Sequence, residues 1–141
     1  MVYLTRRERF SAAHRLYHPG LSEEENERVF GPCANPNYHG HNYELFVTVR
    51  GEPDPQTGLI MNLKELSQLI RREVIEYLDH RNLNEEVPFL QGIVPSCENV
   101  AKAIFHRLQP LLHGCALHSV KLVETENNFA EYFGTEAEGI R

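Results

Sequence analysis

Hydrophobic and polar residues alternate in several parts of the chain, which is the pattern of strands with one buried face. The clearest case lies around 44–50, where one face carries Tyr43, Leu45, Val47 and Val49. The opposite face of this segment is mostly polar. We predict strands over four segments: 2–13, 44–50, 117–125 and 129–133. The last two are close enough to be joined by a hairpin turn at 126–128.

Two other segments repeat their apolar residues every three or four positions, which is typical of helices packed on a core. The first begins near Asn62 and carries Leu63, Leu66, Leu69, Ile70, Val74, Tyr77 and Leu78. The second follows Ser96 and carries Val100, Ile104, Leu108 and Leu111. Ser22 and Glu25 have the spacing of a capping box, which predicts a further short helix in the long loop 18–38.

The order of these elements indicates an α+β fold, because strands and helices are segregated along the chain. We expect a ββααββ arrangement, in which a four-stranded antiparallel sheet is covered on one face by two helices. A length of 141 residues without a linker or repeat predicts a single domain over 1–141. Such a sheet has two open edges, which favours pairing between subunits.

Composition and charge exclude several classes of protein. A net charge of −6 argues against the broad basic surface of a general nucleic-acid binder. The sequence has no long apolar run of the kind that spans a membrane and no signal-peptide pattern at its start. Its three cysteines are an odd number, which argues against a disulfide framework. We therefore expect a cytoplasmic protein that binds neither membrane nor nucleic acid.

The most informative feature is the distribution of the histidines. His39 and His41 lead directly into a predicted strand, and their spacing places both side chains on one face. His14 lies at the end of the first strand, which can pair with the second and complete a group of three. Three imidazoles suit Zn²⁺ and leave a fourth position open, as in catalytic zinc sites. The alternative is that these are solvated strand histidines, because eight histidines produce such pairs by chance.

Two further segments carry possible catalytic groups. Cys33 lies in the loop before the histidine pair, where a nearby cation would favour its thiolate as a base, nucleophile or fourth ligand. The alternative is a small buried side chain. Asp79 and His80 are adjacent at the end of the first long helix and can form a proton relay. The alternative is a histidine favoured by the helix dipole alone.

Glu124 is a carboxylate at a position where its strand otherwise points apolar residues, after Val120 and Leu122. A partly buried carboxylate needs donors, and a ligand with a guanidine-like N–H edge can supply two parallel hydrogen bonds. The alternative is that the strand has already reached solvent at this position.

Together these residues resemble the 6-pyruvoyltetrahydropterin synthase family. The motifs that carry the resemblance are FSAAHRL (10–16), LSEEEN (21–26), FGPCANPNYHGHNY (30–43), GEPDPQTGLIMNL (51–63), LDHRNLN (78–84), SCEN (96–99) and VETENN (123–128). The resemblance implies that His14, His39 and His41 bind one Zn²⁺ per chain, and that Cys33, Asp79 and His80 are catalytic. It implies that Glu124 anchors the pterin, with Ser96 nearby. Cys97 departs from the threonine that the family often has there.

The resemblance also implies an architecture and a reaction. The fold is the tunnelling fold, in which trimers close their sheets into a barrel and two trimers stack as a homohexamer. The reaction is that of a lyase, which converts 7,8-dihydroneopterin triphosphate to 6-pyruvoyltetrahydropterin and triphosphate, with Mg²⁺ accompanying the triphosphate. Another branch, in queuosine biosynthesis, forms 6-carboxytetrahydropterin and acetaldehyde from the same substrate. The five-residue interval between Cys33 and His39 resembles the tetrahydrobiopterin branch. A non-catalytic, zinc-stabilised binding domain is a third hypothesis.

Overall fold

Two long strands form the centre of the sheet in the computed structural model, which describes residues 1–134. Strand β1 (Val2–His14) and strand β2 (His39–Gly51) pair antiparallel along their full lengths. Strand β4 (Ala116–Thr125) pairs antiparallel with β2, and β5 (Asn128–Tyr132) pairs antiparallel with β4. The predicted antiparallel strands are therefore present, in the order β1-β2-β4-β5. The end of the domain expected over 1–141 lies outside the described residues.

The sheet differs from the prediction in two respects. A fifth strand, β3 (Arg81–Asn82), lies at the edge beside β1 and runs parallel to it, so the description as four antiparallel strands was incomplete. Two residues are too short a segment to produce a recognisable alternation. Strand β2 begins at His39, earlier than the predicted 44, because the polar residues before Tyr43 still pair with β1.

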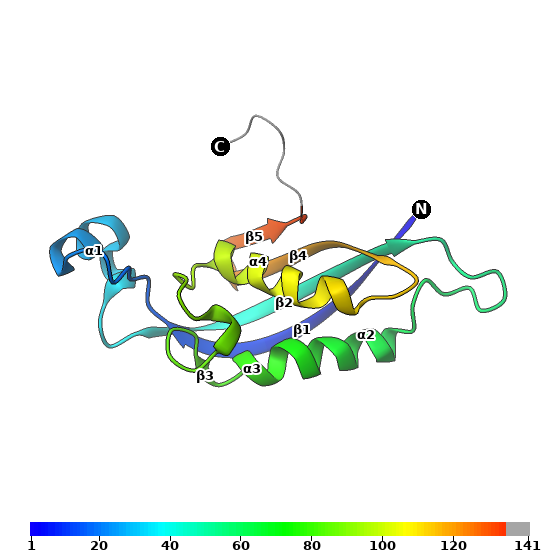
Figure 1. The fold of residues 1–141 in the computed structure, drawn as a ribbon, viewed down its shortest axis with the longest axis horizontal. Helices are drawn as coiled ribbons and strands as arrows, with labels where there is room; N and C mark the ends of the chain where they lie inside the picture. The colour runs from blue at the N-terminus through cyan, green and yellow to red at the C-terminus, as the bar shows by residue number, and fades with distance from the viewer. Residues whose placement is uncertain (135–141) are drawn as a thin grey trace, which may run out of the picture.

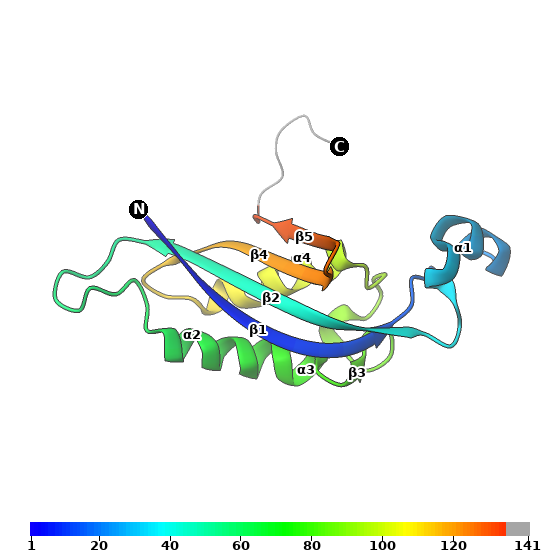
Figure 2. The same ribbon diagram turned by 180° about the vertical axis from the view of Figure 1, so that it is seen from behind.

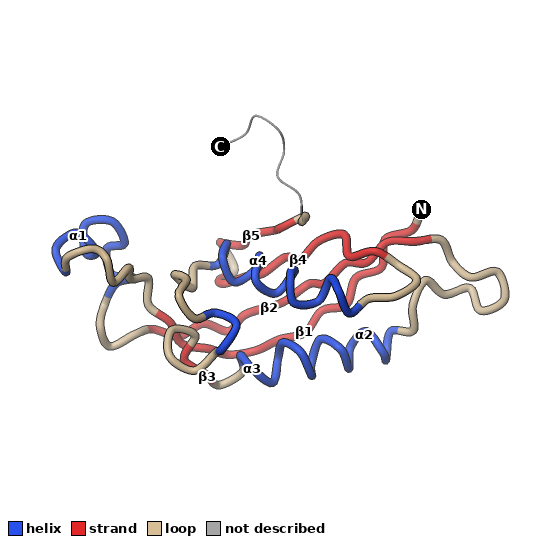
Figure 3. The backbone as a smooth tube through the Cα atoms, viewed as in Figure 1, coloured by secondary structure: helices blue, strands red, loops and turns tan. Residues whose placement is uncertain are grey.

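The helices lie on one face of the sheet, as the periodicity predicted (Figures 1 and 3). The first long helix consists of α2 (Leu63–Ile70), a π-helical turn η2 (Arg71–Ile75) and α3 (Glu76–Leu78). The second, α4 (Cys97–Leu108), is followed by the short 3₁₀ turn η4 (Gln109–Leu111). The side chain of Ser96 caps α4 by accepting a hydrogen bond from the Asn99 N–H.

The π turn explains an irregularity in the apolar pattern of the first helix. Ile70, Val74 and Leu78 are all fully buried although they lie four residues apart in succession, which would drift around a regular α-helix. The wider π turn slows that drift and keeps all three side chains on the sheet. Leu63 and Tyr77 belong to the predicted face but remain 45% and 38% exposed, respectively.

The core lies between the sheet and these helices. It is built from alternate residues of the strands and from the inner faces of α2 and α4, including Tyr43, Leu45, Val47, Leu66, Ile104 and Leu122. The opposite face of the sheet has no helix over it in the described chain, as Figure 2 shows from behind. Among the described residues, no helix is both long and apolar enough to cross a membrane.

The predicted short helix in the long loop is present as α1 (Glu23–Phe30), and its capping box between Ser22 and Glu25 is formed. The helix continues into a 3₁₀ turn, η1 (Gly31–Ala34), which contains Cys33. Both elements lie beyond the end of the sheet where β1 ends and β2 begins (Figure 1). The loop therefore brings Cys33 to the same end of the molecule as the three histidines.

Candidate active site

The three histidines singled out in the sequence come together where β1 and β2 pair. His14 lies directly opposite His39, and His41 lies opposite Ala12 on the same face. The ring centroid of His14 lies 4.6 Å from that of His39 and 5.1 Å from that of His41. One nitrogen from each ring lies within 4.8 Å of the others, so the three side chains can hold a metal ion. Within residues 1–134, no cysteine or carboxylate joins this ligand group.

The hydrogen bonding of His14 prepares it for such a role. Its side chain is 1% exposed, and Nδ1 lies 2.8 Å from the carbonyl oxygen of Pro95. A carbonyl can only accept, so Nδ1 carries the proton and Nε2 keeps its lone pair. The Nε2 atoms of His14 and His41 are buried without a hydrogen-bond partner in the described structure. Buried polar atoms without a partner are costly by themselves, and a bound cation would satisfy them.

The protonation of the cluster also suits a metal. Burial, together with the charges of the neighbouring His39 and His41, lowers the pKa of His14 to about 4 against the opposing effect of the hydrogen bond to the Pro95 carbonyl. Burial also lowers the pKa of His39. His14 is therefore neutral at pH 7, the state in which imidazole binds a metal.

Glu124 faces the same space from β4. Its carboxylate oxygens lie 3.9 Å from Nε2 of His14 and 3.8 Å from Nε2 of His41. Because His14 is neutral at pH 7, its contact with Glu124 is not an ion pair; the two side chains face the same space. Glu124 is only 20% exposed and also lines a cavity of about 410 Å³ with Ser96, Cys97, Asn127 and Phe129. The Glu124 side chain is therefore partly buried, and the alternative that the strand has already reached solvent at this position is wrong.

Ser96 and Cys97 lie at the start of α4, in the wall of that cavity. The Cys97 thiol donates to the carbonyl oxygen of Leu122, at a distance of 3.2 Å. Burial raises the pKa of Cys97 to about 11, and the charge of Glu124 adds to this effect. Cys97 is therefore a neutral, bonded side chain in the cavity wall and not a nucleophile.

Cys33 is half-buried in η1, and its backbone is tied to the strand that bears His14. The N–H of Leu16, two residues after His14, donates to the carbonyl oxygen of Cys33 at 2.7 Å. This contact ties the loop to the residues that follow His14, although the thiol is not one of the cluster's ligand atoms.

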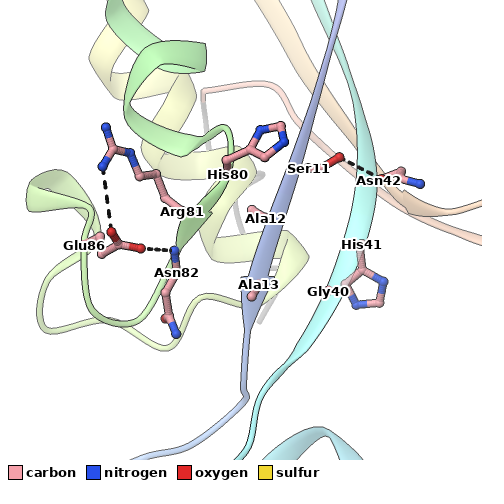
Figure 4. Close-up of a pocket in the computed structure, with 10 residues that line it drawn as sticks. All are labelled: Ser11, Ala12, Ala13, Gly40, His41, Asn42, His80, Arg81, Asn82 and Glu86. Carbon is pink, nitrogen blue, oxygen red and sulfur yellow. Dashed lines mark hydrogen bonds and ion pairs between the residues drawn. The ribbon is translucent and has the colours of Figure 1, made fainter.

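Asp79 and His80 form the expected pair, but neither belongs to the group of three histidines. Oδ2 of Asp79 lies 2.9 Å from Nδ1 of His80, and Oδ1 accepts from the N–H of Ser11 at 2.9 Å. The Ser11 hydrogen bond lowers the pKa of Asp79, and the His80 contacts lower it further. His80 is 82% exposed and lines a pocket of about 490 Å³ that also includes His41 of the histidine cluster (Figure 4). In the described chain, no hydrogen bond or ion pair links this pair to the histidine cluster or to Cys33.

Some residues that shape the site were missed in the sequence. Pro95 supplies a main-chain carbonyl, which no side-chain pattern reveals. Tyr43 was assigned to the core, and it is buried there with its hydroxyl 3.5 Å from Nδ1 of His14. Its position two residues after His41, on the same strand face, was the available signal.

The fold and the site define a class: an α+β protein with three histidines that can hold a metal ion and a carboxylate facing them at one end of the sheet. Residues 3–135 match the family described as 6-pyruvoyl tetrahydropterin synthase, and the chain belongs to this family. It is 49% identical to the 6-pyruvoyl tetrahydrobiopterin synthase of Pongo abelii over 131 residues, which cover 93% of this chain and 90% of that protein.

Two further comparisons bear on the fold and on the branch of the family. The structure of Caenorhabditis elegans 6-pyruvoyl tetrahydropterin synthase superposes with a TM-score of 0.90 at 40% identity, covering 95% of this chain and 96% of that one. The 6-carboxy-5,6,7,8-tetrahydropterin synthase of Bacillus subtilis is 32% identical over 85 residues, which cover 58% of this chain and 54% of that protein.

Proposed function

We propose that the protein is a zinc-dependent lyase that converts 7,8-dihydroneopterin triphosphate to 6-pyruvoyltetrahydropterin and triphosphate. The observation that carries the proposal is the pair of buried, unpartnered Nε2 atoms of His14 and His41, which face the carboxylate of Glu124. Membership of the family and the 49% identity to a 6-pyruvoyl tetrahydrobiopterin synthase support the choice of reaction.

Zinc fits the ligand set, because three neutral imidazoles suit Zn²⁺ and leave a position for the substrate. His14, His39 and His41 would hold it, and the ion would supply Lewis acidity toward oxygen atoms of the substrate side chain. Metal analysis should find about one Zn²⁺ per chain in the wild type and a loss in His39→Ala. His113→Ala, at an exposed histidine away from the cluster, is the matched control. Equal zinc in all three proteins would contradict the site.

The chain's own groups account for binding and proton transfer. Glu124 would accept two hydrogen bonds from the N–H edge of the pterin, in the cavity that it shares with Ser96. Cys33 would act as a base toward the substrate side chain, on the loop tied to Leu16. Cys33→Ala should keep its zinc and lose most turnover, whereas Cys115→Ala should retain both. Loss of zinc from Cys33→Ala would identify a fourth ligand and contradict the mechanism.

Asp79 and His80 would complete the proton relay from a neighbouring chain. Among the described residues of one chain, the pair has no hydrogen bond or ion pair to the histidine cluster, although His80 and His41 line the same pocket. We infer a homohexamer of two trimers, in which open sheet edges pair and the site is completed between chains. Cys33→Ala and His80→Ala, each inactive alone, should recover part of the activity after subunit exchange. No recovery in demonstrably mixed hexamers would place both groups in one chain's site.

The branch of the family is decided by the product. With substrate and Mg²⁺ under anaerobic conditions, mass spectrometry should find a pterin that keeps all three side-chain carbons, together with triphosphate. Release of acetaldehyde with 6-carboxytetrahydropterin would assign the chain to the queuosine branch instead. The partial match to the Bacillus subtilis enzyme makes this the second candidate. Zinc binding without any turnover would leave the non-catalytic binding domain as the function.

A further inference from the structure

The residues that follow β1 hold the turn that carries Cys33. The N–H of Leu16 donates to the carbonyl oxygen of Cys33 at 2.7 Å. Nη2 of Arg15 donates to the next carbonyl, that of Ala34, at 2.8 Å. Two consecutive residues at the end of β1 thus bind two consecutive carbonyls of η1, directly after the metal-cluster residue His14.

Arg15 is itself held in place from two sides. Its guanidinium lies 4.1 Å from the ring centroid of Tyr17, which fixes the plane of the group. Its main chain is bound by Asn84, whose Oδ1 accepts from the Arg15 N–H at 2.9 Å and whose Nδ2 donates to the Arg15 carbonyl at 3.0 Å. Asn84 follows β3, so its contact joins Arg15 to the segment that carries Asp79 and His80.

The other backbone hydrogen bonds of η1 stay within its own loop. The Gly31 N–H donates to the Glu27 carbonyl of α1, and the Asn35 N–H donates to the Pro32 carbonyl. The turn belongs to a long loop, 18–38, that extends beyond the sheet (Figure 1). The position of the thiol relative to the histidines therefore depends on contacts from outside the loop.

We propose that Arg15 is a positioning residue, which holds η1 against the end of β1 and thereby fixes the position of the Cys33 thiol relative to the three histidines. The inference rests on the proposed function of Cys33 as a base. A displacement of about 1 Å in a reacting group can cost roughly a hundredfold in rate, so a loosened turn affects the chemical step more than substrate binding.

Two measurements test the role of Arg15. Arg15→Met should lower kcat at least about tenfold, with KM within about twofold and zinc content unchanged. Amide exchange of the segment 31–38 should become at least about tenfold faster, because the segment loses the Arg15 bond and keeps only the Leu16 bond to the end of β1. Arg15→Lys keeps a donor that can reach the Ala34 carbonyl and should recover part of both losses.

Arg107→Met is the matched control. Arg107 also donates to a main-chain carbonyl, that of Glu73 at 2.6 Å, and lies 4.5 Å from the ring centroid of Tyr77. This variant loses the same types of contact between α4 and η2, so it should reduce stability without changing exchange in 31–38.

Each result separates the possibilities. Unchanged kcat or unchanged exchange in Arg15→Met overturns the proposal, and so does equally fast exchange in Arg107→Met. In a Cys33→Ala background, Arg15→Met should cost no further activity, and a full additional loss would show that Arg15 does not act through the thiol. If the wild type lacks turnover, the proposed function fails, while the exchange comparison still decides whether Arg15 holds the turn.

Discussion

Replacing His14 by Asn should remove a specific acid sensitivity from the metal-free protein. Burial lowers the pKa of His14 from 6.5 to about 4. Below pH 6.5 the unfolded chain takes up a proton at this position while the folded chain does not. The corresponding stability is therefore fully present above pH 6.5 and is lost as the pH falls toward 4. At about 1.4 kcal/mol per pH unit, the loss is about 1.4 kcal/mol at pH 5.5 and about 3 kcal/mol at pH 4.

Urea unfolding of chelator-treated protein between pH 7.5 and 4 measures this effect, at one fixed protein concentration because the chain is proposed to assemble. Asn is a suitable replacement, since its amide nitrogen can still donate to the Pro95 carbonyl that binds Nδ1 of His14. The free energy of unfolding of the wild type, minus that of the variant, should fall by about 3 kcal/mol over the range. Titrating groups outside the histidine cluster contribute equally to both proteins and cancel in this difference.

A constant difference between wild type and His14→Asn across this range would refute the reasoning. It would mean that His14 becomes protonated without cost in the folded state and is not held neutral by burial. His113→Ala, at an exposed histidine, should show the same pH dependence as the wild type and serves as the control.

Three further outcomes are expected. Glu8→Gln should lower the free energy of unfolding by about 1.5–3 kcal/mol in urea, because hydrogen bonds from Arg71 and Arg6 hold its pKa low despite the opposing effect of burial. Glu44→Gln, which loses only an exposed pair at 3.4 Å, should change it by less than about 1 kcal/mol. Glu124→Gln should weaken binding of a pterin analogue in calorimetry and leave zinc content unchanged; unaltered affinity would contradict its role. Sedimentation at micromolar concentration should give a hexamer, and a monomer would contradict the shared site.

Local patterns predicted most of the fold because burial of one face produces a periodic pattern of apolar residues. Strand β2 alternates cleanly, since Tyr43, Leu45, Val47 and Val49 are all buried against the helices. The π turn produces a weaker pattern, a succession of apolar residues four positions apart that ends in Leu78. Strand β3 produces no recognisable pattern, because its two residues pair with β1 through the backbone.

The histidine cluster could be predicted because two strand rules determine it: alternate residues share a face, and antiparallel neighbours meet. The placement of Cys33 was less accessible, because a loop follows no such rule. Its turn is bonded to Arg15 through the Ala34 carbonyl, and Arg15 is bonded to Asn84, contacts that form only after residues far apart in sequence are brought together. No local pattern distinguishes these two residues from ordinary polar positions.

Backbone strain at His80 connects these observations to assembly. His80 has a φ of 59°, an unfavourable conformation for a residue other than glycine. Such conformations cost about 1–3 kcal/mol and persist where the surroundings impose them. Here Ser11 imposes it, since its carbonyl accepts from the His80 N–H at 2.6 Å and its N–H donates to Asp79. Within one chain this conformation presents an imidazole that is 82% exposed and bonded only to Asp79 among the described residues. It is accounted for if the imidazole acts in the site of a neighbouring chain.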